Sequence, residues 1–188
     1  YEYDCTKKHV RWGAFTFDNV TSGDGAKRRD PYKTDPNIPS KYQTSREDYY
    51  NPYNRGHMVA SSDRLYSQEA NDQTFYYSNI SPQLISGFNE GGSTWDAIEN
   101  QIQKWGKVSN AQDTTYIVKG TSIDYAILET GKYGVQIPKY YFSTIRNSFI
   151  SLPVNSLHIF MRIMIRPIKP VASLLPAVHL PVKRCTLS

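Results

Sequence analysis

The chain has 188 residues, of which 39% are hydrophobic, and this is enough for one domain with a buried core. It contains no run of about eighteen apolar residues, so no stretch is a candidate for crossing a membrane. The net charge of +5 is no argument for nucleic-acid binding, because it is unevenly distributed. Residues 1–129 hold all seventeen acidic residues and fourteen basic ones, whereas residues 130–188 hold eight basic residues and no acid.

The first predicted element is a strand over residues 9–17, which alternate apolar with polar or small side chains. Trp12 is expected in the core. Residues 20–53 are rich in Gly, Asp, Lys, Pro, Ser and Tyr, which predicts a long surface loop of the kind that often carries function. The pair Arg28-Arg29 lies in this loop.

A short strand and turn are predicted over residues 53–59 and bear Arg55 and His57. A helix over residues 63–71 follows, capped by one of the serines just before it. Residues 74–80 are rich in β-forming side chains, and the Ser-Pro pair that comes next is expected to end this strand.

The strongest helical pattern follows Gly91 and Gly92. Trp95, Ile98, Ile102 and Trp105 recur at steps of three and four residues, which predicts a helix with these four side chains facing the core. Asn89 precedes this helix, and Glu99 lies beside its apolar stripe.

Two further strands are predicted over residues 114–120 and 135–142. After them the composition changes, because residues 142–188 contain five prolines but no Asp, Glu, Gly, Tyr or Trp. Two interpretations remain open: a Pro-rich, β-leaning C-terminal segment, or a C-terminus translated out of frame. Either one separates a domain of residues 1–142 from an atypical segment of residues 143–188.

The two cysteines, Cys5 and Cys185, could form one long-range disulfide in an exported protein. Because Cys185 lies in the atypical segment, this bridge depends on that segment being native.

Residues 54–99 carry side chains that suit the hydrolysis of a phosphodiester, which needs an activated water and neutralisation of charge on phosphorus. Histidine is the usual base near neutral pH, and His57 is the candidate. A single histidine in a turn is more often structural, and Arg55 on its own would be a solvated surface residue. In this pattern Arg55 becomes a candidate phosphate clamp.

The same stretch offers oxygen ligands for a hard divalent cation. Mg²⁺ keeps several waters and often relies on substrate phosphates, so one amide oxygen can be its direct protein ligand. Asn89 is the candidate for Mg²⁺, or for Mn²⁺ in its place, although an asparagine before a helix is also common as a loop residue. Glu99 is either a group that supports metal-bound water or an exposed helix carboxylate.

Taken together, these residues form a specific string. Arg-Gly-His-Met is followed by four residues and Asp-Arg, then by Tyr-Tyr-Ser-Asn-Ile-Ser-Pro-Gln, and then by Asn, Trp and Glu spaced by five, five and three residues. This string resembles the DNA/RNA non-specific endonuclease family over residues 9–142. The resemblance implies an α+β fold with a ββα-metal core, that is, a central antiparallel sheet flanked by helices. It also implies Mg²⁺-dependent cleavage of DNA and RNA that leaves 5′-phosphates.

By this resemblance, each candidate takes a role at its matching position. His57 matches the general base, Arg55 the arginine before it, and Asn79 an active-site asparagine. Asn89 matches the direct metal ligand, and Glu99 matches the glutamate that supports metal-bound water.

The loop arginine that steadies the transition state should be Arg29, or else Arg28. Two features depart from the family pattern. Asn54 replaces the first residue of the usual Asp-Arg-Gly-His, which removes a negative charge but keeps an oxygen. The tail after Phe142 lacks the residues with which the family continues.

The resemblance therefore makes residues 1–142 a ββα-metal nuclease domain and residues 143–188 an atypical Pro-rich segment. DNA and RNA are the expected partners, with no membrane partner, and the sequence does not indicate an oligomeric state. The family and the candidate disulfide predict a secreted or periplasmic protein. The alternative function is a catalytically weakened nucleic-acid-binding module that descends from such a nuclease.

Overall fold

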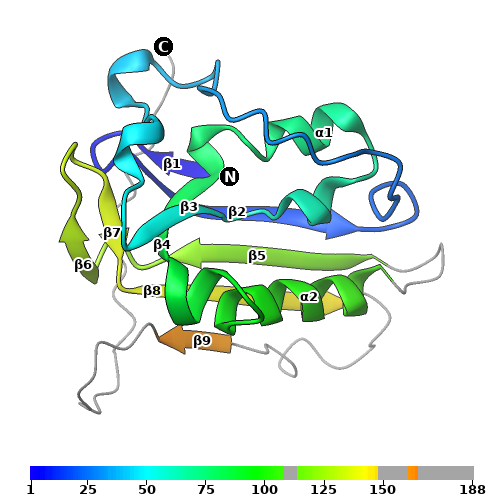
Figure 1. The fold of residues 1–188 in the computed structure, drawn as a ribbon. Coiled ribbons are helices and arrows are strands. Elements are labelled where there is room, and N and C mark those ends of the chain that lie inside the picture. The colour runs from blue at the N-terminus through cyan, green and yellow to red at the C-terminus, as the bar shows by residue number, and fades with distance from the viewer. Residues whose placement is uncertain (108–113, 148–160, 165–188) are drawn as a thin grey trace.

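A computed structural model describes residues 1–107, 114–147 and 161–164 (Figure 1). Its centre is an antiparallel five-stranded sheet in the order β1-β2-β5-β8-β9. These strands are β1 (Glu2–Asp4), β2 (His9–Phe17), β5 (Thr115–Thr121), β8 (Tyr140–Asn147) and β9 (Met161–Met164). Two smaller sheets pair β3 (Tyr53–His57) with β4 (Ile80–Leu84), and β6 (Ile127–Thr130) with β7 (Gln136–Pro138). The α-helices are α1 (Gln68–Gln73) and α2 (Thr94–Gly106).

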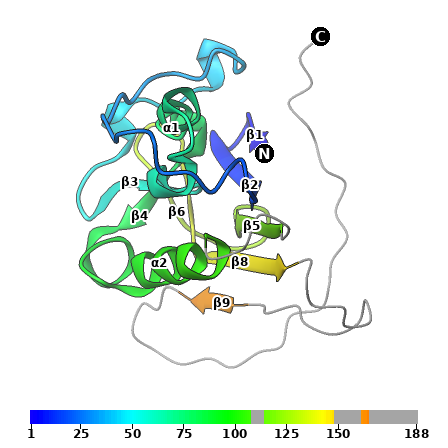
Figure 2. The same ribbon diagram turned by 90° about the vertical axis from the view of Figure 1, so that its right-hand side faces the viewer.

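The β3–β4 pair and α2 lie together on one side of the central sheet (Figures 1 and 2). β3, β4 and α2 form the ββα unit, with α1 and short turns between β3 and β4 along the chain. Within the described ranges, no helix covers the opposite side of the sheet. This architecture confirms the predicted α+β fold with a central antiparallel sheet.

The core lies between α2 and the sheet. Trp95 is fully buried, with ring centroids 5.7 Å from Phe88 and 5.4 Å from Tyr141. At the other end of α2, Gly106 lets Phe17 of β2 come close, because a Cβ there would lie 2.1 Å from the phenylalanine ring. These contacts hold α2 along the sheet and so place the side chains on its other face beside β3.

The alternating patterns located several strands well. The strand predicted over residues 9–17 is β2, and those predicted over 53–59 and 114–120 are β3 and β5 to within two residues. The strand predicted over 135–142 is divided into β7 and β8. β8 continues to Asn147, across the domain boundary expected at residue 142, and that division stays a prediction.

Two tryptophans that were expected in the core are exposed. Trp12 is 39% exposed because it faces the side of the sheet that no described helix covers, and its Nε1 donates a hydrogen bond to Glu2. Trp105 is 45% exposed because the last core position of α2 belongs to Gly106, which packs on Phe17.

Two predicted elements between β3 and α2 were wrong. The helix predicted over residues 63–71 is a 3₁₀ turn, Ser61–Arg64, followed by α1, which is capped by Ser67. The strand predicted over residues 74–80 is replaced by β4, which begins at Ile80 and continues through Pro82. β4 pairs with β3 alone, so the missing N–H of Pro82 leaves no sheet neighbour without a donor.

Two further predictions concern residues outside the described ranges. Cys185 lies there, so its pairing with Cys5 stays a prediction. Most of residues 143–188 also lie there, and both interpretations of that segment stay open. In the part of the chain that the structure describes, no helix has the length and apolarity needed to span a bilayer.

Candidate active site

A cleft of about 370 Å³ opens between the loop before β3, β3 itself and α2. It brings together residues that are distant in sequence: Arg28, Asn54, Arg55, His57, Asn89 and Glu99. Arginines and a histidine come from the loop and β3, and amide and carboxylate groups come from β3, the segment before α2 and α2.

β3 presents Arg55 and His57 on the same face because they are two residues apart. Gly56 between them has its α-carbon against the side chain of Gln83, where an added Cβ would lie 2.0 Å from Oε1 and 2.5 Å from Cγ. The glycine therefore allows β4 and its buried glutamine to pack behind β3. Within the Arg-Gly-His string, each of the three residues has its own physical role.

His57 is 9% exposed and packs edge-on against Phe75, with ring centroids 4.8 Å apart. Its Nε2 is buried and has no hydrogen-bond partner among the described residues. Burial lowers the pKa of His57 to about 3, and the positive charge of Arg28 acts in the same direction. The imidazole is therefore neutral at physiological pH and able to accept a proton.

Two arginines line the cleft beside this histidine. The guanidinium of Arg55 lies 4.0 Å from the ring centroid of Tyr32, and that of Arg28 lies 5.2 Å from the ring centroid of Phe75. Arg28 also pairs with Asp30 at 2.7 Å. Stacking on aromatic rings orients both cations. The N–H groups of Arg55 are left able to bind phosphate oxygens, whereas Arg28 already donates to Asp30 from Nε and Nη2 and offers its remaining N–H groups.

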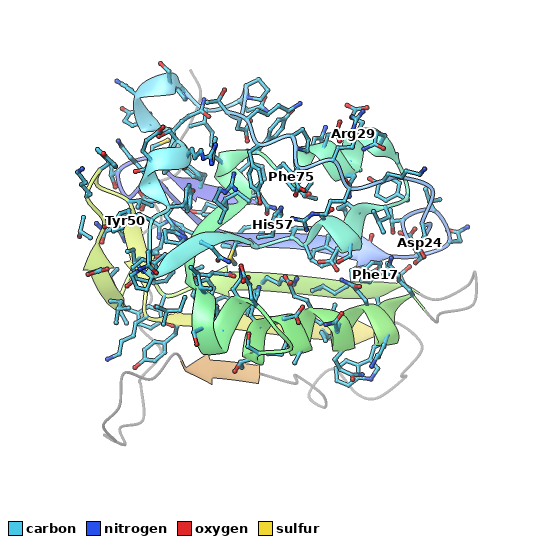
Figure 3. The ribbon with its side chains drawn as sticks, viewed as in Figure 1. Phe17, Asp24, Arg29, Tyr50, His57 and Phe75 are labelled. Atoms are coloured by element: carbon cyan, nitrogen blue, oxygen red, sulfur yellow. The ribbon has the colours of Figure 1, made fainter. Side chains whose placement is uncertain are left out.

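Arg29 is placed differently. Its guanidinium pairs with Asp72 of α1, and the residue does not line the cleft. Figure 3 shows Arg29 beside α1, with Phe75 and His57 nearer the centre of the molecule. Of the two loop arginines that the sequence left open, Arg28 is the one in the cleft.

The opposite side of the cleft carries oxygen atoms. Asn89 donates from Nδ2 to Oδ1 of Asn54 at 2.7 Å, and Asn54 donates from its own Nδ2 to Glu90. Because Asn89 uses its nitrogen in this contact, its Oδ1 is available to a cation. Asn54 thus orients the side chain of Asn89. The aspartate that the family motif has at position 54 would add a negative charge here, and Asn54 does not.

Glu99 lies in the same cleft with its side chain 17% exposed. Its Oε1 accepts a hydrogen bond at 3.0 Å from Lys119, whose Nζ also binds the buried Asp63 at 3.1 Å. Burial raises the pKa of Glu99 above its ordinary value, and the positive charge of Lys119 opposes that rise. Sequence reasoning missed Lys119, although a lysine two residues after Ile117, and so on the same face of a predicted strand, was a usable signal.

Asn79 does not line the cleft. Its Nδ2 donates to the carbonyl oxygens of Val59 and Thr74, and its Oδ1 accepts from the amide of Val59. The side chain therefore joins the segment after β3 to the segment before β4. By these contacts it supports the position of His57 and does not itself reach the cleft.

The groups in the cleft fit a hard divalent cation. No three His, Cys, Asp or Glu side chains in the described ranges are placed to hold a metal ion. The cleft does contain the amide oxygen of Asn89 and the carboxylates of Glu90, Asp96 and Glu99. Such oxygen donors suit an ion that keeps part of its water shell and completes its coordination with a substrate phosphate.

Comparison with known proteins identifies relatives of this chain. It is 29% identical over 171 residues to "Nuclease 1, mitochondrial" of Schizosaccharomyces pombe, which covers 86% of this chain and 52% of that protein. It is 31% identical over 122 residues to "Endonuclease G, mitochondrial" of Caenorhabditis elegans, covering 64% and 38% of the two chains. The fold also matches a chain in the crystal structure of the EndoG/EndoGI complex with a TM-score of 0.63 and 22% identity, covering 76% of this chain and 62% of that one.

These relatives contradict the predicted secreted or periplasmic location, because they are named mitochondrial nucleases. That prediction was based on the family resemblance and a candidate disulfide, neither of which specifies a compartment. The chain spans about half the length of the S. pombe relative and less of the other. The family model described as DNA/RNA non-specific endonuclease matches residues 1–162, and the chain therefore belongs to this family.

Proposed function

We propose that this chain is a sugar-non-specific endonuclease that hydrolyses phosphodiester bonds of DNA and RNA with Mg²⁺, or Mn²⁺, and leaves 5′-phosphates. The observation that carries the proposal is the composition of one cleft. It holds a neutral histidine with an unpaired Nε2, two arginines on one side and hard oxygen donors on the other. Family membership supports the same reaction and the same substrates.

In this proposal the neutral imidazole of His57 accepts the proton of the attacking water. The depressed pKa keeps the imidazole unprotonated before the substrate binds, and the approaching phosphate would raise its basicity. Arg55 and Arg28 bind the non-bridging oxygens of the phosphate, where negative charge increases in the transition state. Contacts to the phosphate alone explain cleavage without base recognition.

Asn89 would hold the cation through Oδ1, and Glu99 would orient its hydration water. A divalent cation at this position supplies charge neutralisation at phosphorus and at the departing oxygen. Asn79 acts indirectly in this scheme, by fixing the backbone on either side of the β3–β4 pair. Residues 1–142 are the proposed catalytic domain, since every one of these groups lies within them.

A cleavage assay tests the proposal. Supercoiled plasmid and single-stranded RNA should both be degraded with Mg²⁺ and remain intact with EDTA, and end-labelling should detect 5′-phosphates. His57→Ala should lower kcat by about 10²- to 10⁴-fold, the range for loss of a general base. Arg29→Ala is the matched control, because this arginine comes from the same loop but is not in the cleft, and it should change kcat less than Arg28→Ala.

Two results would reject the assignment. Equal rates for His57→Ala and the wild type would remove His57 as the base. Binding of DNA or RNA without any Mg²⁺-dependent cleavage would instead identify the chain as a nucleic-acid-binding module.

A further inference from the structure

Lys119 is a buried cation beneath the cleft that the proposed reaction leaves unused. Its side chain is 0% exposed, and its Nζ lies between Oδ2 of Asp63 and Oε1 of Glu99 at 3.1 and 3.0 Å. The ring centroids of Phe15 and Trp95 are each 5.6 Å from this nitrogen. Burial of an ammonium group is unfavourable unless it is paired, so the two carboxylates are what keep Lys119 charged at this depth.

The two carboxylates differ in their other contacts. Asp63 is fully buried, and it also accepts hydrogen bonds from the amide of Ala60 at 3.0 Å and from Nε2 of Gln103 at 3.1 Å. Glu99 lies at the cleft, and within the described ranges Lys119 is its one hydrogen-bond donor. Asp63 is therefore held by three groups, whereas the orientation of Glu99 depends on Lys119.

We propose that Lys119 is a positioning residue for Glu99: it binds Oε1 of that carboxylate from beneath the cleft and so leaves Oε2 for the hydration water of the cation. This inference rests on the proposed function, because it assigns Lys119 a part in the same site. The Asp63 carboxylate anchors the lysine, since its own position is determined by the Ala60 amide and by Gln103.

The charges around Glu99 support this role. Burial raises the pKa of Glu99, the neighbouring Asp63 and Asp96 carboxylates raise it further, and Lys119 lowers it. The Lys119 ion pair therefore both orients Glu99 and favours its ionised form.

A double-mutant cycle tests the proposal. Mn²⁺ affinity, measured by isothermal titration calorimetry, and single-turnover cleavage of DNA are compared in the wild type, Lys119→Met, Glu99→Gln and the double variant. Lys119→Met should weaken Mn²⁺ affinity or slow cleavage by about 10- to 100-fold, the range for an outer group that orients a metal site. The double variant should be no worse than Glu99→Gln, because the lysine acts through the glutamate. Ile117→Val, which alters a buried side chain of the same strand, should change neither quantity.

The proposal is overturned if folded Lys119→Met keeps wild-type Mn²⁺ affinity and cleavage rate. It is also overturned if the fold-loss in the double variant equals the product of the fold-losses in Lys119→Met and Glu99→Gln. Lys119→Gln, whose amide can still donate to Asp63, replaces the methionine variant if that variant does not fold. Failure of both to fold would assign Lys119 to folding alone and reject the positioning role. A wild type that binds Mn²⁺ but does not cleave would reject the proposed function, and the Mn²⁺ cycle would still decide the role of Lys119.

Discussion

Replacing Gly56 by alanine tests how the cleft is built. The new Cβ would lie 2.0, 2.1 and 2.5 Å from Oε1, Cδ and Cγ of Gln83, closer than real Cβ atoms approach other atoms. Gln83 is 0% exposed, and the clash extends to its Cγ, so a rotation of the terminal amide alone cannot relieve it. Either β3 separates from β4, or the glutamine leaves its buried position.

The size of the effect follows from that clash. Overpacking a tight core costs about 1–3 kcal/mol, and alanine in place of glycine within a strand would otherwise be favourable by about 0.5–1 kcal/mol. Gly56→Ala should therefore lower the free energy of unfolding by about 1 kcal/mol. It should also displace His57, the next residue, and reduce kcat.

Urea denaturation followed by circular dichroism measures this change. Gly25→Ala is the matched control, since a Cβ there meets nothing within 4 Å, and it should leave stability within about 0.5 kcal/mol of the wild type. Gln83→Ala should relieve the clash, so the double variant should be more stable than the sum of the two single effects. This packing argument is refuted if the free energy of unfolding of Gly56→Ala is within about 0.5 kcal/mol of the wild-type value. It is also refuted if the effects of Gly56→Ala and Gln83→Ala simply add in the double variant.

Three further outcomes are expected. Asn89→Ala should abolish Mg²⁺-dependent cleavage, and an unchanged Mg²⁺ titration would remove Asn89 from the ligand set. Asn54→Asp should keep activity and tighten Mn²⁺ binding, because it places a second carboxylate beside Glu90; a calorimetric titration showing weaker binding would contradict this. Burial lowers the pKa of His9 to about 4, so below its unfolded value of about 6.5 only the unfolded chain takes up this proton. The stabilisation that comes from keeping His9 neutral should be complete above pH 6.5 and fall by about 3 kcal/mol towards pH 4. Urea denaturation at a series of pH values should therefore show a smaller change in the free energy of unfolding over this range for His9→Gln than for the wild type. An equal change in the two proteins would show that His9 does not contribute.

The sequence by itself determined the local elements and the identity of the main reactive groups. The two-residue alternation of residues 9–17 located β2, and the spacing of Trp95, Ile98 and Ile102 located α2, because each pattern reflects the geometry of a single element. The string around His57 also predicted which side chains would meet, and the structure places His57, Arg55, Asn89 and Glu99 in one cleft.

Only the tertiary structure decided which faces are covered and which partners each polar group has. Trp12 and Trp105 have the pattern of core residues, yet both are exposed, because local periodicity does not specify whether another element packs on a face. The choice of Arg28 over Arg29 depended on the pairing of Arg29 with α1. Lys119 pairs with Asp63, which is 56 positions earlier in the chain, and with Glu99, which is 20 positions earlier. Such long-range contacts form only when β5, the turn after β3 and α2 are packed together.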